Sequence, residues 1–165
     1  MVFWKVKNKF KNLAYSLFGQ DLEQRVKEEV AKEARVDPKI LDQYKVGVGE
    51  LGYVCFLQKI GNGIKRVCGK VLGAYDRFQR KIYLDWLAYL GKYFKPFRRL
   101  FVLTYAHELW HALQHYFGKL KSYRSGEEYL RNYERDENEK EARKVSEKIV
   151  DRICGPSLGS LSLYS

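Results

Sequence analysis

The chain has 165 residues and a formal net charge of +11, with 31 lysines and arginines against 20 aspartates and glutamates. Its length suits one domain with a substantial core, and its 45% hydrophobic content is ordinary for a globular protein. No apolar run approaches the ~20 residues of a membrane span. Lysines interrupt the first 20 residues, which do not fit a secretory signal. We therefore expect a cytoplasmic protein.

The basic charge favours contact with nucleic acid, an anionic membrane surface or acidic proteins, without selecting among them. The composition offers a competing explanation. It is rich in Lys, Arg and Glu, with one Met and one Thr, and charge-rich sequences of this kind are typical of heat-adapted proteins. Charge alone therefore predicts no particular partner.

The first third of the chain is predicted to be helical. Apolar residues alternate with lysines over residues 2–18, which predicts a basic amphipathic helix that either docks on the domain or contacts a membrane or nucleic acid. Asp21 is expected to cap a second helix that ends at about Arg35. Asp37-Pro38 then begins a turn or short helix. We expect residues 1–50 to form a helical N-terminal extension.

The middle of the chain, residues 52–85, is predicted to form a small, mostly antiparallel sheet. Its segments are rich in Val, Ile, Tyr, Phe and Cys, and turn residues separate them. The predicted strands are residues 52–60, 64–72, 71–76 and 81–85.

The first two of these strands flank Gly61-Asn62-Gly63 and predict a β-hairpin. Asn-Gly is the stronger turn dipeptide, so a loop of residues 62 and 63 is favoured, which leaves Cys55 and Cys68 diagonal. A loop of residues 61 and 62 would instead place the two cysteines opposite each other, where they could form a disulfide.

Helices are predicted to dominate the last part of the chain. A short helix or irregular segment is expected over residues 86–94, followed by a long helix over residues 96–117 that Gly118 stops. A last helix is expected over residues 133–153. Residues 155–165 are expected to form a C-terminal tail.

The long helix carries His107, Glu108 and His111, the pattern H-E-x-x-H. Two histidines four residues apart lie on one face of a helix and can reach the same metal ion. Glu108 then lies beside that ion, where a carboxylate can take a proton from a water bound to it. The neighbouring positions 109, 110, 112 and 113 are uncharged, as a buried helix requires. The alternative is a buried helix whose histidines are satisfied by hydrogen bonds.

A catalytic zinc usually has three protein ligands and a water, so a third ligand must come from elsewhere. His115 lies ~12 Å further along the helix axis than His107, with no glycine to turn the chain, and we expect it to be a pocket-rim or core residue. On a helical wheel of the last helix, Glu139 lies about 50° from the centre of the apolar face and Glu141 about 110°. Glu139 is therefore the predicted third ligand, and Glu141 is the alternative.

The stretch from about Val71 to Ala142 resembles the gluzincin metallopeptidases, particularly the small single-domain minigluzincins. Phage and plasmid zincin-like proteins and the IrrE/ImmA-like peptidases share the arrangement. The matching segments are residues 104–113, TYAHELWHAL, and residues 139–142, EKEA, which resemble the zincin helix signature and the E-x-x-A glutamate-helix motif. The resemblance implies one α+β zincin-like domain over residues 1–165, with the sheet packed on both motif helices.

The resemblance also implies a function, that of a zinc metalloendopeptidase acting on peptide or protein substrates. Zn²⁺ would be held by His107, His111 and Glu139, with Glu108 as the general base. Gly73-Ala74-Tyr75 would be the edge strand that binds extended substrate by strand addition. The motifs do not identify the residue that stabilises the oxyanion; the candidates are Tyr123, Tyr129 and Tyr133.

Two other interpretations stay open from the sequence. One is a latent or inactive zinc-binding protein kept for interaction. In some minigluzincins the C-terminal segment is thought to hold the enzyme latent, and residues 157–165 could lie along the Gly73–Asp76 edge in the same way, or pack on the flank of the domain. The other is a DNA-associated protease that acts on nucleic-acid-bound proteins, which the basic charge would suit.

Overall fold

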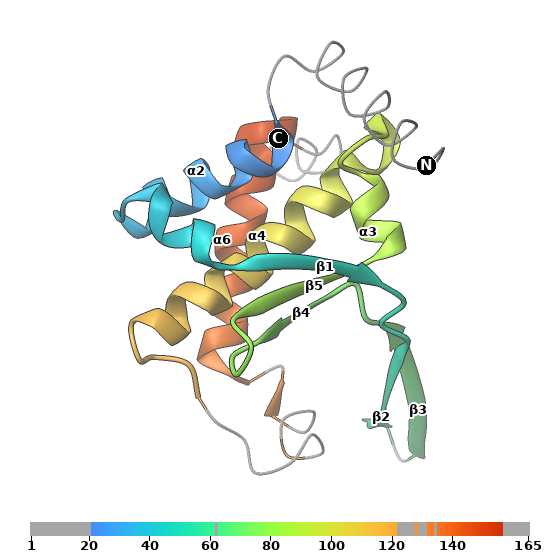
Figure 1. Ribbon diagram of the computed structural model, residues 1–165. Coiled ribbons are helices and arrows are strands. Elements are labelled where there is room, and N and C mark those ends of the chain that lie inside the picture. The colour runs from blue at the N-terminus through green and yellow to red at the C-terminus, as the bar shows by residue number, and fades with distance from the viewer. Residues whose placement is uncertain (1–20, 62, 122–127, 129–131, 134, 157–165) are drawn as a thin grey trace, which may run out of the picture.

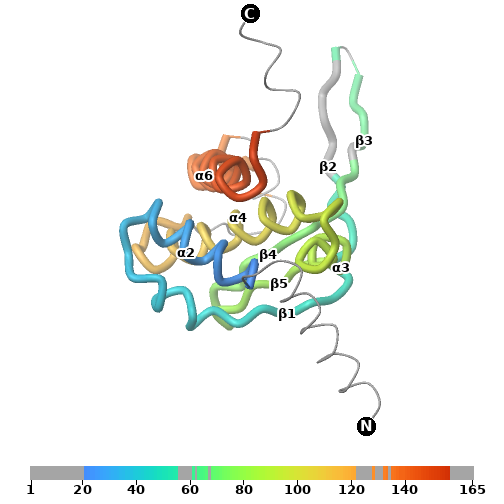
Figure 2. Tube along the Cα trace, turned by 90° about the horizontal axis from the view of Figure 1, so that it is seen from above, coloured from blue at the N-terminus to red at the C-terminus, as the bar shows by residue number. Residues whose placement is uncertain are grey.

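Helix α4 (Arg98–Tyr116) runs through the middle of the molecule (Figure 1). Seen from above in Figure 2, strands β1 (Lys45–Gly49), β5 (Lys81–Asp85) and β4 (Gly73–Asp76) lie on one side of α4, and helix α6 (Glu137–Cys154) lies on the other. The fold is therefore α+β, as predicted.

The computed structural model describes residues 21–61, 63–121, 128, 132–133 and 135–156, and for residues 56–60 and 67 it describes the backbone alone. The predicted amphipathic helix at residues 2–18 and the predicted tail at 157–165 lie outside the described residues. None of the described helices is both long and apolar enough to cross a membrane.

Four helices begin directly after an aspartate whose carboxylate accepts a hydrogen bond from the backbone N–H two residues further on. They are α2 (Leu22–Ala34), the 3₁₀ helix η1 (Pro38–Gln43), α3 (Trp86–Leu90) and α6. These caps satisfy N–H groups that a helix start leaves without partners. The helices predicted after Asp21 and Asp37 are confirmed, but α6 begins at residue 137 instead of 133, because Asp136 provides its cap.

Helix α4 follows a 3₁₀ turn, η2 (Lys95–Phe97), that contains Pro96. It ends at Tyr116, and Gly118 has a φ of 67°, the left-handed conformation that ends many helices. The prediction of a long helix stopped by Gly118 is confirmed. Most residues of α4 are buried, because the sheet covers one side of the helix while α2 and α6 cover others.

The three-stranded sheet has the order β1-β5-β4, with β1 parallel to β5 and β4 antiparallel to it. The prediction that residues 1–50 are helical was wrong at β1, and the sheet is mixed instead of mostly antiparallel. Strand β1 reads Lys-Val-Gly-Val-Gly and carries little strand signal of its own. Gly47 lies opposite Tyr83, and a Cβ at Gly47 would come within 3.1 Å of the Tyr83 ring, so the neighbouring strand supplies the packing that the glycine lacks.

Strands β2 (Tyr53–Ile60) and β3 (Gly63–Lys70) form a separate two-stranded sheet, which stands away from the rest of the molecule in Figure 1. Ile60 pairs with Gly63, which leaves residues 61 and 62 as the loop, and Cys55 lies opposite Cys68 in a disulfide. The favoured register, with the cysteines diagonal, was wrong. Gly61 has a φ of 58°, so it supplies the positive φ of the turn, and only the observed register lets the cysteines bond.

Helix α6 packs against α4 and α2, on the side of α4 away from the sheet. The expectation that the sheet packs on both motif helices is therefore correct for α4 and wrong for α6. The α4–α6 contact buries apolar residues of both helices, among them Leu109, Leu113, Val145 and Ile149. Lys148 and Arg152 of α6 also form ion pairs with Glu33 of α2, at 2.6 and 2.9 Å.

Asp85 joins three elements at the end of β5. Its side chain is fully buried and accepts hydrogen bonds from the backbone N–H groups of Leu87 (3.0 Å) and Leu51 (3.2 Å), and Lys70 lies 3.1 Å away. Burial raises the pKa of Asp85, but these hydrogen bonds and the Lys70 ammonium outweigh burial and hold the pKa below its ordinary value. Asp85 therefore links the base of the hairpin to the sheet and to α3.

We expect Asp85→Asn to lower the free energy of unfolding at pH 7 by about 2–4 kcal/mol, because it weakens a buried charge-assisted network. A carboxylate with a lowered folded pKa contributes its stability above its unfolded pKa and loses it as the pH falls through the folded pKa. The difference between wild type and variant, measured by urea denaturation, should therefore shrink below about pH 4. Asp37→Asn is the control: that cap is exposed, and Asn caps as well as Asp does. A difference that does not change with pH would contradict the role of the charge.

Candidate metal centre

Two helices bring three metal-binding side chains together. His107 and His111 lie one turn apart on α4, and Glu139 lies in the first turn of α6. The Nε2 atoms of the two histidines are 3.0 Å apart. The Glu139 carboxylate places Oε2 3.2 Å from His107 Nε2 and Oε1 3.3 Å from His111 Nε2. One ligand atom from each of the three residues lies within 4.8 Å of the others.

This geometry suits a small metal ion. With metal–ligand bonds of about 2.0–2.1 Å, a tetrahedral ion separates its donor atoms by about 3.3 Å, which is close to the observed separations. A carboxylate is an acceptor only, and a neutral imidazole offers a lone pair at one nitrogen. Acceptor atoms at this distance repel each other unless a hydrogen or a metal ion lies between them. The residues present therefore could hold a metal ion.

Ionisable groups at this centre are deeply buried: Glu108, His111 and Glu139 are 7%, 7% and 4% exposed. Burial lowers the pKa of His111, but the hydrogen bond to Glu139 and the charges of Glu108 and Glu139 outweigh it and raise the pKa to about 9. Burial raises the pKa of Glu108, and the two histidines partly oppose that shift. Two carboxylates facing two imidazoles in a poorly solvated place therefore attract positive charge.

Glu108 is not a member of the three-residue group. Its carboxyl lies on the side of α4 that faces β4, and the backbone N–H of Tyr75 donates a hydrogen bond to it. Gly73 allows this approach: a Cβ at this position would lie 2.8 Å from Glu108 Oε1 and 2.6 Å from Thr104 Cγ2. The absence of a side chain at Gly73 thus lets β4 lie directly over Glu108.

Among the strands that the structure describes, β4 lies at an edge of the three-stranded sheet. The N–H of Asp85 donates to the carbonyl of Leu72, so residues 72, 74 and 76 form the hydrogen-bonded pairs with β5. The backbone groups of Gly73 and Tyr75 consequently point away from β5, towards the open edge and Glu108. The sequence prediction named residues 73–75 as an edge strand, and the structure places them beside the cluster.

His115 belongs to a different contact. Its Nδ1 lies 2.8 Å from the Tyr75 hydroxyl, and it is not part of the three-residue group. The expectation of a rim or core position agrees with its intermediate exposure.

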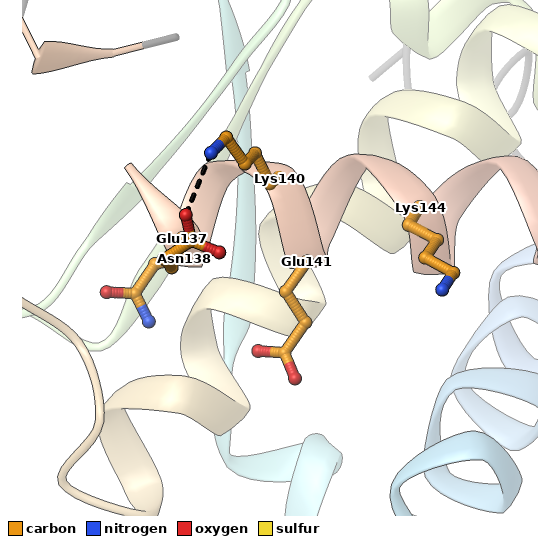
Figure 3. Close-up of a pocket in the computed structure, with 5 residues that line it drawn as sticks. All are labelled: Glu137, Asn138, Lys140, Glu141 and Lys144. Carbon is orange, nitrogen blue, oxygen red and sulfur yellow. Dashed lines mark hydrogen bonds and ion pairs between the residues drawn. The ribbon is translucent and has the colours of Figure 1, made fainter. Parts of the chain in front are cut away.

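Glu141, the alternative ligand, lies on the exposed side of α6 and accepts a hydrogen bond from Gln114 Nε2 at 2.8 Å. In Figure 3 it lines a surface hollow along the helix with Glu137, Asn138, Lys140 and Lys144. Neither histidine of the cluster lines this hollow. The helical phase that selected Glu139 over Glu141 thus agrees with the positions of the two side chains.

Tyr133 is half-buried near the cluster. Burial raises its pKa, and the negative charges of Glu139 and Glu108 add to the shift. Its ring lies 5.8 Å from the Arg143 guanidinium carbon. The other two oxyanion candidates, Tyr123 and Tyr129, lie outside the described residues.

One residue of the centre was not predicted. Gln114 is buried one turn after His111, and its Oε1 lies 2.8 Å from His111 Nδ1. Glutamine is not a metal ligand in any of the patterns used above. The only sequence signal for it was its spacing of three residues from His111 on a helix.

Comparison with known proteins adds no assignment: no family model, no curated protein and no solved structure matches the chain. The chemistry of the site therefore has to be argued from the residues themselves.

We expect Gly73→Ala to lower the free energy of unfolding by about 1–3 kcal/mol, because the added methyl group overpacks a buried contact that a short Thr104 side chain cannot vacate. Chemical denaturation measures the change. Gly49→Ala in strand β1 is the matched control, since a Cβ there meets no atom within 4 Å. Equal stability of the two variants would show that β4 does not press on Glu108 as described.

Proposed function

We propose that this chain is a zinc-dependent metalloendopeptidase of the gluzincin type, with a zincin-like fold. The observation that carries the proposal is the convergence of His107, His111 and Glu139 beside Glu108, a buried carboxylate that is outside the group. Three ligands that leave a coordination position open, with a separate base next to them, are the arrangement of hydrolytic zinc sites.

The donor set supports zinc over magnesium and calcium. Two imidazoles and one carboxylate form a common ligand set of catalytic zinc, whereas Mg²⁺ and Ca²⁺ prefer oxygen ligands throughout. The disulfide cysteines 55 and 68 lie in the hairpin and are not available as ligands. His107, His111 and Glu139 would hold the ion.

The chain's own residues would perform the other parts of the reaction. Bound zinc would supply a Lewis acid that makes a water acidic near neutral pH. Glu108 would take the proton of the attacking water and pass it to the leaving amine. Of the three candidate tyrosines, Tyr133 is the one within the described residues, and its hydroxyl would donate a hydrogen bond to the oxyanion. The charges of Glu139 and Glu108 raise the pKa of Tyr133, which indicates that its hydroxyl lies near the site.

An extended peptide is the substrate that suits β4. The backbone N–H and carbonyl of Gly73 and the carbonyl of Tyr75 can pair with an added strand, whereas the Tyr75 N–H is bonded to Glu108. Strand addition holds a peptide by its main chain. Such a peptide would run beside Glu108, because Gly73 lies against that side chain. Main-chain pairing predicts low sequence selectivity, so an unfolded protein is the appropriate first substrate.

We expect His107→Ala, His111→Ala and Glu139→Ala each to lose most of the bound zinc, because each removes one of three ligands. Metal content is measured by elemental analysis after dialysis against a weak chelator. His115→Ala is the control and should keep zinc, since its side chain does not belong to the group. Full zinc occupancy in Glu139→Ala would rule out this ligand set.

We expect Glu108→Gln to bind zinc and fold as the wild type does, but to hydrolyse an unfolded protein at least ~10³-fold more slowly, because the base and the metal act as a unit. Peptide release from a fluorescent unfolded substrate provides the rate. Zinc-bound wild type with no hydrolysis above Glu108→Gln would support a zinc-binding protein without peptidase activity and would end the mechanism proposed here.

A further inference from the structure

Gln114 makes three polar contacts beside the cluster. It is 3% exposed and lies near the end of α4. Its Oε1 is 2.8 Å from His111 Nδ1, and its Nε2 donates to the carbonyl of Asn138 (3.0 Å) and to Glu141 Oε2 (2.8 Å). One partner is therefore the ring of His111, and the other two belong to the first two turns of α6.

The orientation of the Gln114 amide follows from its partners. The Asn138 carbonyl oxygen and the Glu141 carboxylate can only accept hydrogen bonds, so the NH₂ end of the amide must face them. If the amide were flipped, its oxygen would face two oxygens in a buried place, which is costly. The oxygen end must therefore face His111.

This orientation fixes the tautomer of His111. Because the Gln114 oxygen can only accept, His111 Nδ1 must carry a proton. In a neutral, metal-bound ring the lone pair is then on Nε2, the atom that lies 3.0 Å from His107 Nε2 and 3.3 Å from Glu139 Oε1. The same amide holds Asn138, the residue before Glu139, against α4. One side chain thus sets the coordinating nitrogen of one ligand and the position of another.

We infer that Gln114 is a positioning residue of the metal centre: it selects the Nε2-coordinating tautomer of His111 and docks the first turn of α6, and Glu141 holds Gln114 in that orientation. The inference rests on the proposed metal binding. It assigns Glu141 a role as support for Gln114 in place of a role as ligand.

Gln114→Met tests the inference in the full-length protein, because it keeps the volume and removes both ends of the amide. We expect zinc affinity, measured by chelator competition, to fall about 10–100-fold, as is usual when a hydrogen-bond partner of a ligand is lost. The ¹⁵N NMR signals of the histidines in the presence of zinc should show a new population of His111 that carries its proton on Nε2 and is therefore not bound to zinc through that atom. Ser146→Ala is the control. It removes a buried hydroxyl of α6 that donates to the Arg143 carbonyl, and it should change stability without changing zinc affinity or the His111 tautomer.

A double variant, Gln114→Glu with Glu141→Gln, provides a rescue. The new carboxylate at position 114 can accept from His111 Nδ1–H, and the new amide at position 141 can donate to that carboxylate, so the hydrogen bond that sets the tautomer is rebuilt. The bond that Gln114 Nε2 donates to the Asn138 carbonyl is not rebuilt, because a carboxylate cannot donate. We therefore expect the double variant to restore the wild-type tautomer of His111, whether or not it restores the full zinc affinity. This variant also decides the question if Gln114→Met does not fold.

The outcomes separate the two proposals. Wild-type protein that binds no zinc overturns both the metallopeptidase and the role of Gln114. Wild-type zinc binding with unchanged affinity and tautomer in Gln114→Met overturns only the role of Gln114. A double variant that folds but carries the His111 proton on Nε2 overturns it as well, because the rebuilt hydrogen bond would then not set the tautomer.

Discussion

The packing of helix α6 against helix α4 is the constraint on which the candidate site depends. His107 and His111 lie on one element, but Glu139 reaches them only because the apolar face of α6 is buried against α4. The contact is apolar along most of its length and polar at one end, where Glu139, Asn138 and Gln114 meet. Hydrophobic burial, which has no directional preference, brings the helices together. The hydrogen bonds at the polar end then fix their relative position.

That polar end is costly to maintain. Burying ionised groups costs several kcal/mol per ion unless they are paired and hydrogen-bonded, and here two carboxylates and two imidazoles are gathered in one buried place. An apolar contact of the same size would be at least as stable. The cluster is therefore poorly explained as a device for stability. Its donor atoms lie at distances at which they could hold a cation, which would offset the repulsion between acceptors. The ion pairs between α2 and α6 differ from this cluster, because their side chains are partly exposed to solvent and lose less hydration when they pair.

The sequence predicted those features that depend on local patterns. Asp21, Asp37 and Gly118 mark helix ends through capping chemistry, which is local, and the structure confirms them. The inward orientation of Glu139 was predictable because an 18-residue helix has a clear apolar face, and Glu139 lies close to that face. Strand β1 could not be found this way, since Gly47 gains its packing from Tyr83, which is 36 residues away. Gln114 was missed for a similar reason: its partners Asn138 and Glu141 lie 24 and 27 residues further along the chain.

The hairpin register shows how a tertiary constraint overrides a local preference. Asn-Gly favours the turn at residues 62 and 63 by a propensity of the order of ~1 kcal/mol or less, whereas a disulfide stabilises by about 2–4 kcal/mol and forms only when Cys55 faces Cys68. The register then continues into the rest of the fold: Tyr53 pairs with Lys70, and Lys70 reaches Asp85 at the end of β5. Because β5 holds β4, and Gly73 of β4 lies against Glu108, the position of the open edge over the candidate base depends on pairings that begin in a hairpin outside the site.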